Sequence, residues 1–317
     1  MKRRNFIYTT SMLAAAGLLK SESLFSFPNP LKKIGIQLFS LPKLLEKDFK
    51  GTIKMLAQMG YKELELYGPY PFSAQEAIDR WKSITPSLGF SGSGYFGLTA
   101  QQVKDALKEN GMTTPSIHTD WITLQKNMNA LGEAGHLLGF EYVGLPLIPA
   151  ENRKNLDDYK RMADEFNKVG EQAKKVGLKF AYHNHGYGLN EIDGQIPLKL
   201  ILERTDPKLV FFEMDLFWTV AGGADPVTYL KSYPGRYRLM HVKNMREKKR
   251  FSGDGGDSNQ WIELFPYMTT AGEGVLDLRA IIAQAQQSGV THFFVEQDMV
   301  ANPEVELKKS LDYLKAL

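Results

Sequence analysis

The stretch GLKFAYHNH, from Gly177 to His185, shows how this chain is built. The residues before it, Asp158–Val176, have helical spacing, and glycine is typical of the position that ends a helix. The next six residues, Leu178–His183, are mostly apolar, as in a strand whose outer face is covered. Polar side chains then follow, with His183 and His185 sharing one parity.

The same alternation of a short apolar strand and a longer connecting stretch occurs eight times. We predict strands at Ile34–Phe39, Glu63–Tyr67, Thr114–Thr119, Tyr142–Leu147, Leu178–His183, Leu209–Asp215, Arg238–Lys243 and His292–Gln297. Helical spacing is clearest at Phe49–Met59, Ala100–Glu109, Asp158–Val176, Leu276–Ser288 and Val305–Leu314. Strict alternation implies a parallel sheet, and eight units in about 285 residues imply an α/β fold of the closed (β/α)8 TIM-barrel type. We expect this barrel to be a single domain over residues 29–317.

Composition narrows the chemistry. Of the 317 residues, 43% are hydrophobic and 24% are charged, as in a soluble globular protein. The chain has no cysteine, which excludes disulfides, thiolate metal sites and a cysteine nucleophile. The net charge of +3 arises within residues 1–28, so residues 29–317 carry 35 basic and 35 acidic side chains. This neutral balance argues against a nucleic-acid partner.

The N-terminus has the layout of an export signal. Lys2-Arg3-Arg4 precede an apolar stretch from Phe6 to Leu19, which is shorter than the ~20 residues of a membrane-spanning helix. The run from Arg3 to Ile7 resembles a twin-arginine signal. We therefore expect residues 1–28 to be a signal peptide and the mature protein to be periplasmic, without a stable membrane anchor. The alternative is an amphipathic N-terminal helix or anchor.

Polar residues gather where the last four barrel strands end. Alternate residues of a barrel strand point inward, and active sites form at the C-terminal ends of the strands. Inward charge there is costly unless it is paired or bound to something. Oxygen and imidazole ligands without sulfur suit Mn²⁺, Mg²⁺, Co²⁺, Fe²⁺ or Zn²⁺. The residues that share this parity are His183, His185, Glu213, Asp215, His241, Lys243, Glu296 and Asp298.

Further residues are candidates for contact with a substrate. Gln37 on the first strand and Glu63 or Glu65 on the second share inward parity within their strands, and His118 ends the third strand. Two long connections, 68–98 and 244–275, carry aromatic residues that suit stacking on a sugar ring, among them Tyr95 and Trp261. The alternative for each aromatic is plain loop packing. The chain has neither a phosphate-binding loop nor a G-x-S-x-G nucleophile elbow.

Seven blocks in order, IGIQLFSL, YKELELYG, AYHNHGYGL, FEMDLFW, HVKN, GEGVLD and FFVEQD, resemble the sugar phosphate isomerase/epimerase family of xylose isomerase-like TIM barrels. The resemblance implies a divalent metal held by Asp215, His241 and Glu296. His183 stands where the ketose epimerases of the family have a glutamate ligand, and we expect it to be the fourth ligand. Trp218 stands where they have a histidine, and we place it near the substrate.

These residues lead to a functional expectation. We expect a metal-dependent sugar isomerase or epimerase that abstracts a proton next to a carbonyl, with Glu296 as base or ligand. His185 would face the substrate, although the two histidines could exchange roles, and Lys243 would stabilise negative charge or simply pair with Asp215 or Asp298. A phosphorylated substrate is not expected for an exported enzyme. The alternatives are a lyase, dehydratase or keto-glycoside-cleaving enzyme on the same scaffold, and a non-catalytic carbohydrate-binding barrel.

Overall fold

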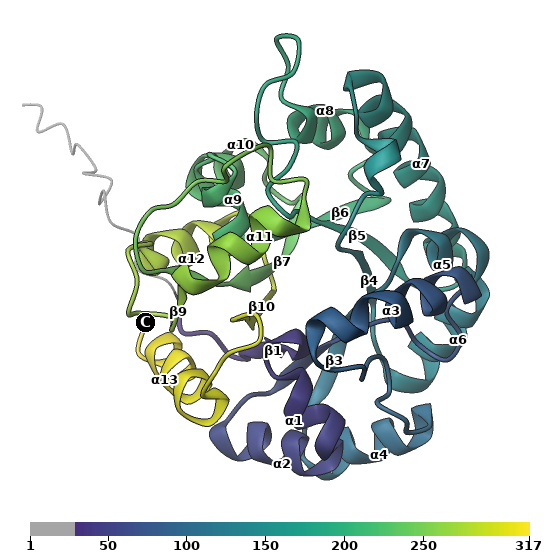
Figure 1. The fold of residues 1–317 in the computed structure, drawn as a ribbon, viewed down its shortest axis with the longest axis vertical. Helices are drawn as coiled ribbons and strands as arrows, with labels where there is room; N and C mark the ends of the chain where they lie inside the picture. Colours follow the sequence, from purple (N-terminus) through teal and green to yellow (C-terminus); the bar gives the residue numbers. More distant parts are fainter. Residues whose placement is uncertain (1–28) are drawn as a thin grey trace, which may run out of the picture.

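A computed structural model describes residues 29–317 of the chain, so the predicted signal peptide lies outside the described residues. Eight parallel strands form a closed barrel in the order β1-β10-β7-β6-β5-β4-β3-β2, which confirms the predicted (β/α)8 fold (Figure 1). The barrel strands are β1 (Gly35–Gln37), β2 (Glu63–Tyr67), β3 (Thr113–His118), β4 (Tyr142–Leu145), β5 (Lys179–His183), β6 (Val210–Asp215), β7 (Tyr237–Val242) and β10 (His292–Val295).

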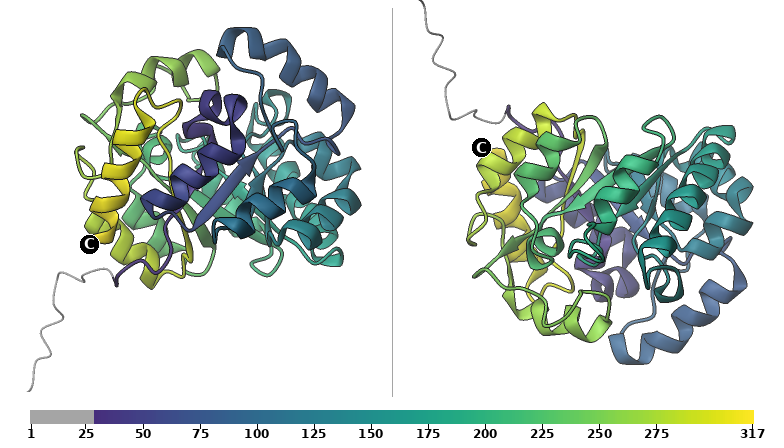
Figure 2. Two further views of the ribbon diagram at one scale, coloured as in Figure 1. Left: turned by 90° about the horizontal axis from the view of Figure 1, so that it is seen from below. Right: turned by 90° about the horizontal axis from the view of Figure 1, so that it is seen from above.

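Helices surround the barrel and cover its outer face (Figure 2). They are α1 (Pro42–Lys47), α2 (Phe49–Met59), α3 (Gln75–Leu88), α4 (Ala100–Glu109), α5 (Trp121–Lys126), α6 (Met128–Leu138), α7 (Leu156–Lys175), α8 (Pro197–Arg204), α9 (Leu216–Ala221), α10 (Pro226–Ser232), α11 (Ser258–Leu264), α12 (Leu278–Gln287) and α13 (Pro303–Lys315). The predicted bounds of α2 and α4 are confirmed. No helix within residues 29–317 is long and apolar enough to cross a membrane.

The two long connections hold more regular structure than the sequence predicted. The first contains α3, and the second contains α11 and the short antiparallel pair β8 (Asn244–Met245) and β9 (Met268–Thr269). Every residue of α3 is at least partly exposed, and the helix contains Pro86, a residue that disfavours a helix interior. Both helices lie at the opening of the barrel (Figure 1).

The inside of the barrel changes from apolar to polar along its axis. Tyr142, Ala181, Leu239 and Phe294 pack together in one buried layer. One step further along the strands, the inward residues are mostly charged or polar. Gly144 makes room in this polar layer, because a Cβ atom at that position would lie 2.6 Å from Cδ2 of His118. An apolar layer thus lies beneath the layer of ionisable groups at the C-terminal end of the barrel strands.

Candidate active site

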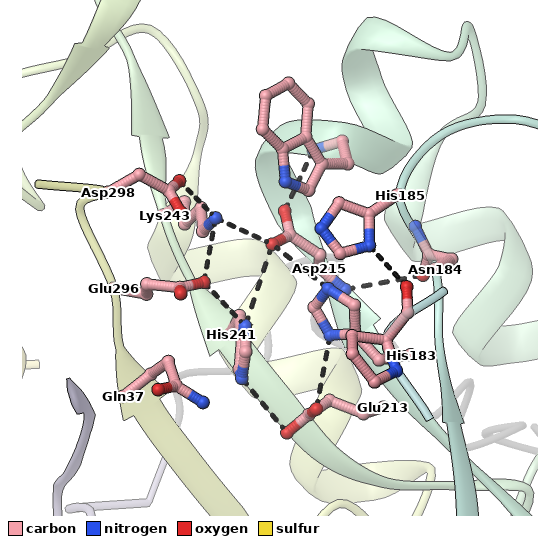
Figure 3. Close-up of polar contacts among 12 residues, drawn as sticks. Gln37, His183, Asn184, His185, Glu213, Asp215, His241, Lys243, Glu296 and Asp298 are labelled. Carbon is pink, nitrogen blue, oxygen red and sulfur yellow. Dashed lines mark hydrogen bonds and ion pairs between the residues drawn. The ribbon is translucent and has the colours of Figure 1, made fainter. Parts of the chain in front are cut away.

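The inward residues of β5, β6, β7 and β10 meet at the C-terminal end of the barrel, as their parity predicted (Figure 3). The strand register places His183 beside Glu213 and Asp215 beside His241. These side chains are almost completely buried, although they are ionisable. Such a concentration of buried charge requires partners, a bound cation or both.

Asp215, His241 and Glu296 form the group nearest to the opening that could hold a metal ion. Nδ1 of His241 lies 2.7 Å from Oε2 of Glu296 and 3.7 Å from Oδ2 of Asp215. Among the described residues, Asp215 Oδ2 and His241 Nδ1 make ion pairs, with Lys243 at 3.1 Å and Glu296 at 2.7 Å, but no hydrogen bond of good geometry, although both are buried. Two carboxylates and an imidazole that converge in this way suit a divalent cation. Nε2 of His183 lies 3.9 Å from the same Asp215 oxygen, within reach of this site.

Lys243 lies beside this group, with its ammonium among three carboxylates. Its Nζ is 2.6 Å from Asp298, 2.8 Å from Glu296 and 3.1 Å from Asp215. Burial alone would lower the pKa of Lys243, but these three carboxylates raise it well above its usual range. Lys243 thus pairs with both Asp215 and Asp298, which the sequence analysis gave as one alternative for its role. Lys243 also lines the cavity described below.

His185 diverges from His183 because β5 ends between them. Its Nδ1 lies 2.5 Å from the carbonyl oxygen of Pro146 and must donate a proton to it, so Nε2 carries the lone pair. Burial first, then the charges of His183 and Lys243, lower the pKa of His185 well below its usual value. The imidazole is thus neutral at neutral pH and able to accept a proton.

A second group of ionisable residues lies deeper in the barrel. Nε2 of His118 is 2.6 Å from Oε2 of Glu213, and Nδ1 of His183 is 3.2 Å from the same oxygen. Nε2 of His241 is 2.6 Å from Oε2 of Glu65, which also accepts from Nε2 of Gln37 at 2.8 Å. The second set of residues that could hold a metal ion is His118, His183, Glu213 and His241.

A cavity of about 680 Å³ opens above the two groups. One wall is polar, with Lys243, Glu296 and Asp298. The aromatic part of the lining comes from the turn after β1, from β2, and from α3 and α5. Trp81, one of the aromatic residues of the first long connection, lines the cavity, and the lining residues that the sequence did not single out include Phe39, Tyr67 and Trp121.

The predicted substrate residues divide between the cavity and its surroundings. Gln37 and His118 line the cavity, together with His185. Glu65 is completely buried and lies outside the set of described residues that line it. The remaining three are also outside the described residues that line the cavity. Tyr95 is buried against Tyr70 at 5.5 Å between ring centroids, Trp218 stacks on Phe251 at 5.6 Å, and Trp261 lies 5.0 Å from the ring of His185.

Comparison with known proteins agrees with this architecture. Residues 53–317 match the model of the xylose isomerase-like TIM barrel family, and the chain belongs to this family. An inosose dehydratase from Clostridium beijerinckii is 25% identical over 288 residues, which cover 85% of this chain and 90% of the relative.

Two solved structures illustrate the likeness in fold. A sugar phosphate isomerase/epimerase from Parabacteroides distasonis has a TM-score of 0.70 and 23% identity, covering 93% of this chain and 96% of that one. The IolI protein with a bound zinc atom has a TM-score of 0.63 and 13% identity, covering 90% and 95%. The family resemblance seen in the sequence is confirmed, and relatives of this fold include both isomerase/epimerase and dehydratase proteins.

Proposed function

We propose that this chain is a divalent-metal-dependent isomerase or epimerase that removes a proton next to a carbonyl of an unphosphorylated carbohydrate. One observation carries the proposal. The buried group of Asp215, His241 and Glu296, whose possible ligand atoms converge, adjoins a cavity that Lys243 and His185 also line. Membership of a family that includes sugar isomerases and epimerases supports this reaction class and a carbohydrate substrate.

The residues present fit a metal ion. Asp215 Oδ2, His241 Nδ1, Glu296 Oε2 and His183 Nε2 would hold it, and Asp215 is already fixed because its Oδ1 accepts from the backbone N–H of Trp218 at 2.9 Å. Mn²⁺, Mg²⁺, Co²⁺, Fe²⁺ and Zn²⁺ all accept such ligands. When bound, the ion supplies a Lewis acid that polarises the carbonyl oxygen of the substrate.

The chain's own residues perform the proton transfer. His185 is neutral, and its Nε2 takes the proton from the carbon next to the carbonyl. Lys243 stabilises the negative charge that develops on the substrate oxygen. Burial would raise the pKa of Glu296, but Lys243 and His241 lower it well below its usual value. Glu296 therefore stays ionised, as a metal ligand or as the acceptor on the second face of the sugar.

A dehydratase is the second candidate, and Asp298 favours it. Burial raises the pKa of Asp298 to about 7, although Lys243 opposes the shift, so its carboxyl is partly protonated at neutral pH. A protonated carboxyl on the cavity wall can donate to a leaving hydroxyl. The likeness to inosose dehydratases supports this alternative as well.

The location of the enzyme bears on its substrate. We propose that residues 1–28 direct export of the folded chain to the periplasm, where phosphorylated sugars are not expected. A reporter fused after residue 28 should be exported, and replacing Arg3 and Arg4 by lysine should retain it in the cytoplasm. Unchanged export of the double variant would contradict the twin-arginine assignment.

Product analysis tests the reaction. The metal-loaded enzyme and a chelator-treated sample are incubated with a panel of keto-sugars, and the products are identified by NMR and mass spectrometry. An isomerase or epimerase gives a product of unchanged mass, whereas a dehydratase gives a product smaller by one water. Turnover that is equal with and without metal would contradict the proposal, and turnover of no sugar in the panel would favour a binding barrel.

A further inference from the structure

We infer that Glu65 and Glu213 are positioning residues for the metal site, and that each holds one histidine in the tautomer that directs its free nitrogen to the ion. This inference rests on the proposed function, because it assumes the ion at Asp215, His241 and Glu296. Neither glutamate needs to touch the ion or the substrate. Both act from the layer beneath, where Glu65 and Glu213 are almost completely buried.

The hydrogen bonds around Glu65 determine which nitrogen of His241 carries a proton. Gln37 Oε1 accepts from the backbone N–H of Phe39 at 3.0 Å, so the amide nitrogen of Gln37 must be the atom that faces Glu65. An ionised carboxylate only accepts, and His241 Nε2 at 2.6 Å from Glu65 therefore supplies the proton. The other nitrogen, Nδ1, is the one that faces Asp215 and Glu296.

Glu213 orients His183 in the same way, with the two nitrogens exchanged. Nδ1 of His183 lies 3.2 Å from Oε2 of Glu213, and Nε2 faces Asp215 (Figure 3). Donation from Nδ1 to the glutamate leaves the lone pair on Nε2. Hydrogen bonds of this kind fix ring orientation in metal sites and raise the basicity of the ligand nitrogen.

His118 joins the two glutamates. Its Nε2 is 2.6 Å from Glu213 and 3.3 Å from Glu65. One imidazole thus contacts both buried carboxylates and ties the two halves of this layer together. The layer thus consists of two carboxylates that orient ligands, one bridging histidine, and Gln37 as a fixed donor.

The same strand offers a matched control. Glu63 lies two residues before Glu65 on β2 and is also buried, and it faces a histidine as well, with His292 Nδ1 at 2.8 Å. That pair lies at the opposite end of the barrel. Glu63→Gln therefore removes a buried carboxylate beside a histidine without touching the layer beneath the metal site.

The test measures Zn²⁺ affinity and stoichiometry of the full chain by competition with a chromophoric chelator, with thermal midpoints recorded for every variant. Glu65→Gln and Glu213→Gln should each weaken Zn²⁺ binding about 10- to 100-fold. Glu63→Gln should leave it unchanged, and the wild type should bind one ion. Unchanged affinity in both test variants, or two ions per chain with Glu213 as a ligand, would overturn the inference.

Nitrogen NMR of the Zn²⁺-loaded wild type gives a readout that does not depend on how the variants fold. Long-range ¹H–¹⁵N spectra should show a protonated Nε2 in His241 and a protonated Nδ1 in His183. The opposite tautomer in either ring would overturn the inference while leaving the metal site itself intact. A wild type that binds no Zn²⁺, Mn²⁺ or Co²⁺ would instead overturn the proposed function.

Discussion

Replacing Lys243 by methionine tests how the buried charges are balanced. The side chain is 2% exposed, and its ammonium is within 3.1 Å of Asp215, Glu296 and Asp298. Methionine fills a similar volume but leaves these carboxylates without their common cation. Removing one partner from a buried ion pair costs about 3–5 kcal/mol. For a chain of this size, that corresponds to a fall in Tm of roughly 5–8 °C.

The assay is thermal unfolding of metal-free protein in a chelating buffer at neutral pH. Lys309→Met is the control, because Lys309 pairs with Glu273 on the surface at 2.9 Å, and this exposed pair should contribute no measurable stability. Adding Mn²⁺ should recover part of the loss in Lys243→Met, since a bound cation replaces the missing charge.

The pH dependence of this effect has a definite sign. Burial opposes ionisation of Asp215 and Glu296, but Lys243 and the neighbouring histidines hold their pKa values below the usual range. The stability that Lys243 provides is therefore present at neutral pH and is lost as pH falls through these lowered values. A Lys243→Met variant as stable as the wild type at pH 7 without metal would refute the reasoning.

Three further predictions concern the metal and the cavity. The double variant Asp215→Ala, His241→Ala lacks two of the proposed ligands, so its metal content should fall below about a tenth of the wild-type content. Atomic emission measures this content, and retained metal would contradict the assignment. Burial lowers the pKa of His241, but the charges of Glu213, Glu296 and Glu65 raise it well above its usual value. Metal binding should therefore release a proton from His241. Calorimetric enthalpies should therefore vary with the ionisation enthalpy of the buffer, and affinity should fall as pH is lowered; enthalpies independent of the buffer would argue against this. Trp261→Ala should raise KM about tenfold with metal content unchanged, because its ring packs on His185, and unchanged kinetics would show that this aromatic only packs.

The fold was predictable because each barrel unit repeats one local pattern. Short apolar strands alternate with longer stretches, and glycines such as Gly60 end helices in the left-handed conformation, where φ is 111°. Helix α3 was missed because Pro86 lies inside it and proline disfavours a helix interior, although Ile78, Trp81 and Leu88 have helical spacing. Trp81, one of the aromatic residues expected to suit a sugar ring in this connection, lines the cavity.

The candidate site was predictable only as a set of inward positions. Parity brought Glu213, Asp215 and His241 to one face, and the barrel register confirms this. Parity could not separate His183 from His185, because alternation applies only within a strand and β5 ends at His183. The link between Glu65 and His241 joins residues 176 positions apart, and such a contact depends on closure of the barrel.

The most direct test of the proposed chemistry is hydrogen exchange at carbon. The metal-loaded enzyme is incubated with its keto-sugar substrate in deuterium oxide and followed by ¹H NMR. We predict that deuterium enters the carbon next to the carbonyl, and that His185→Gln or Glu296→Gln slows this exchange by more than 100-fold, roughly the contribution of a general base. Turnover of the substrate with no proton lost from that carbon would contradict the account.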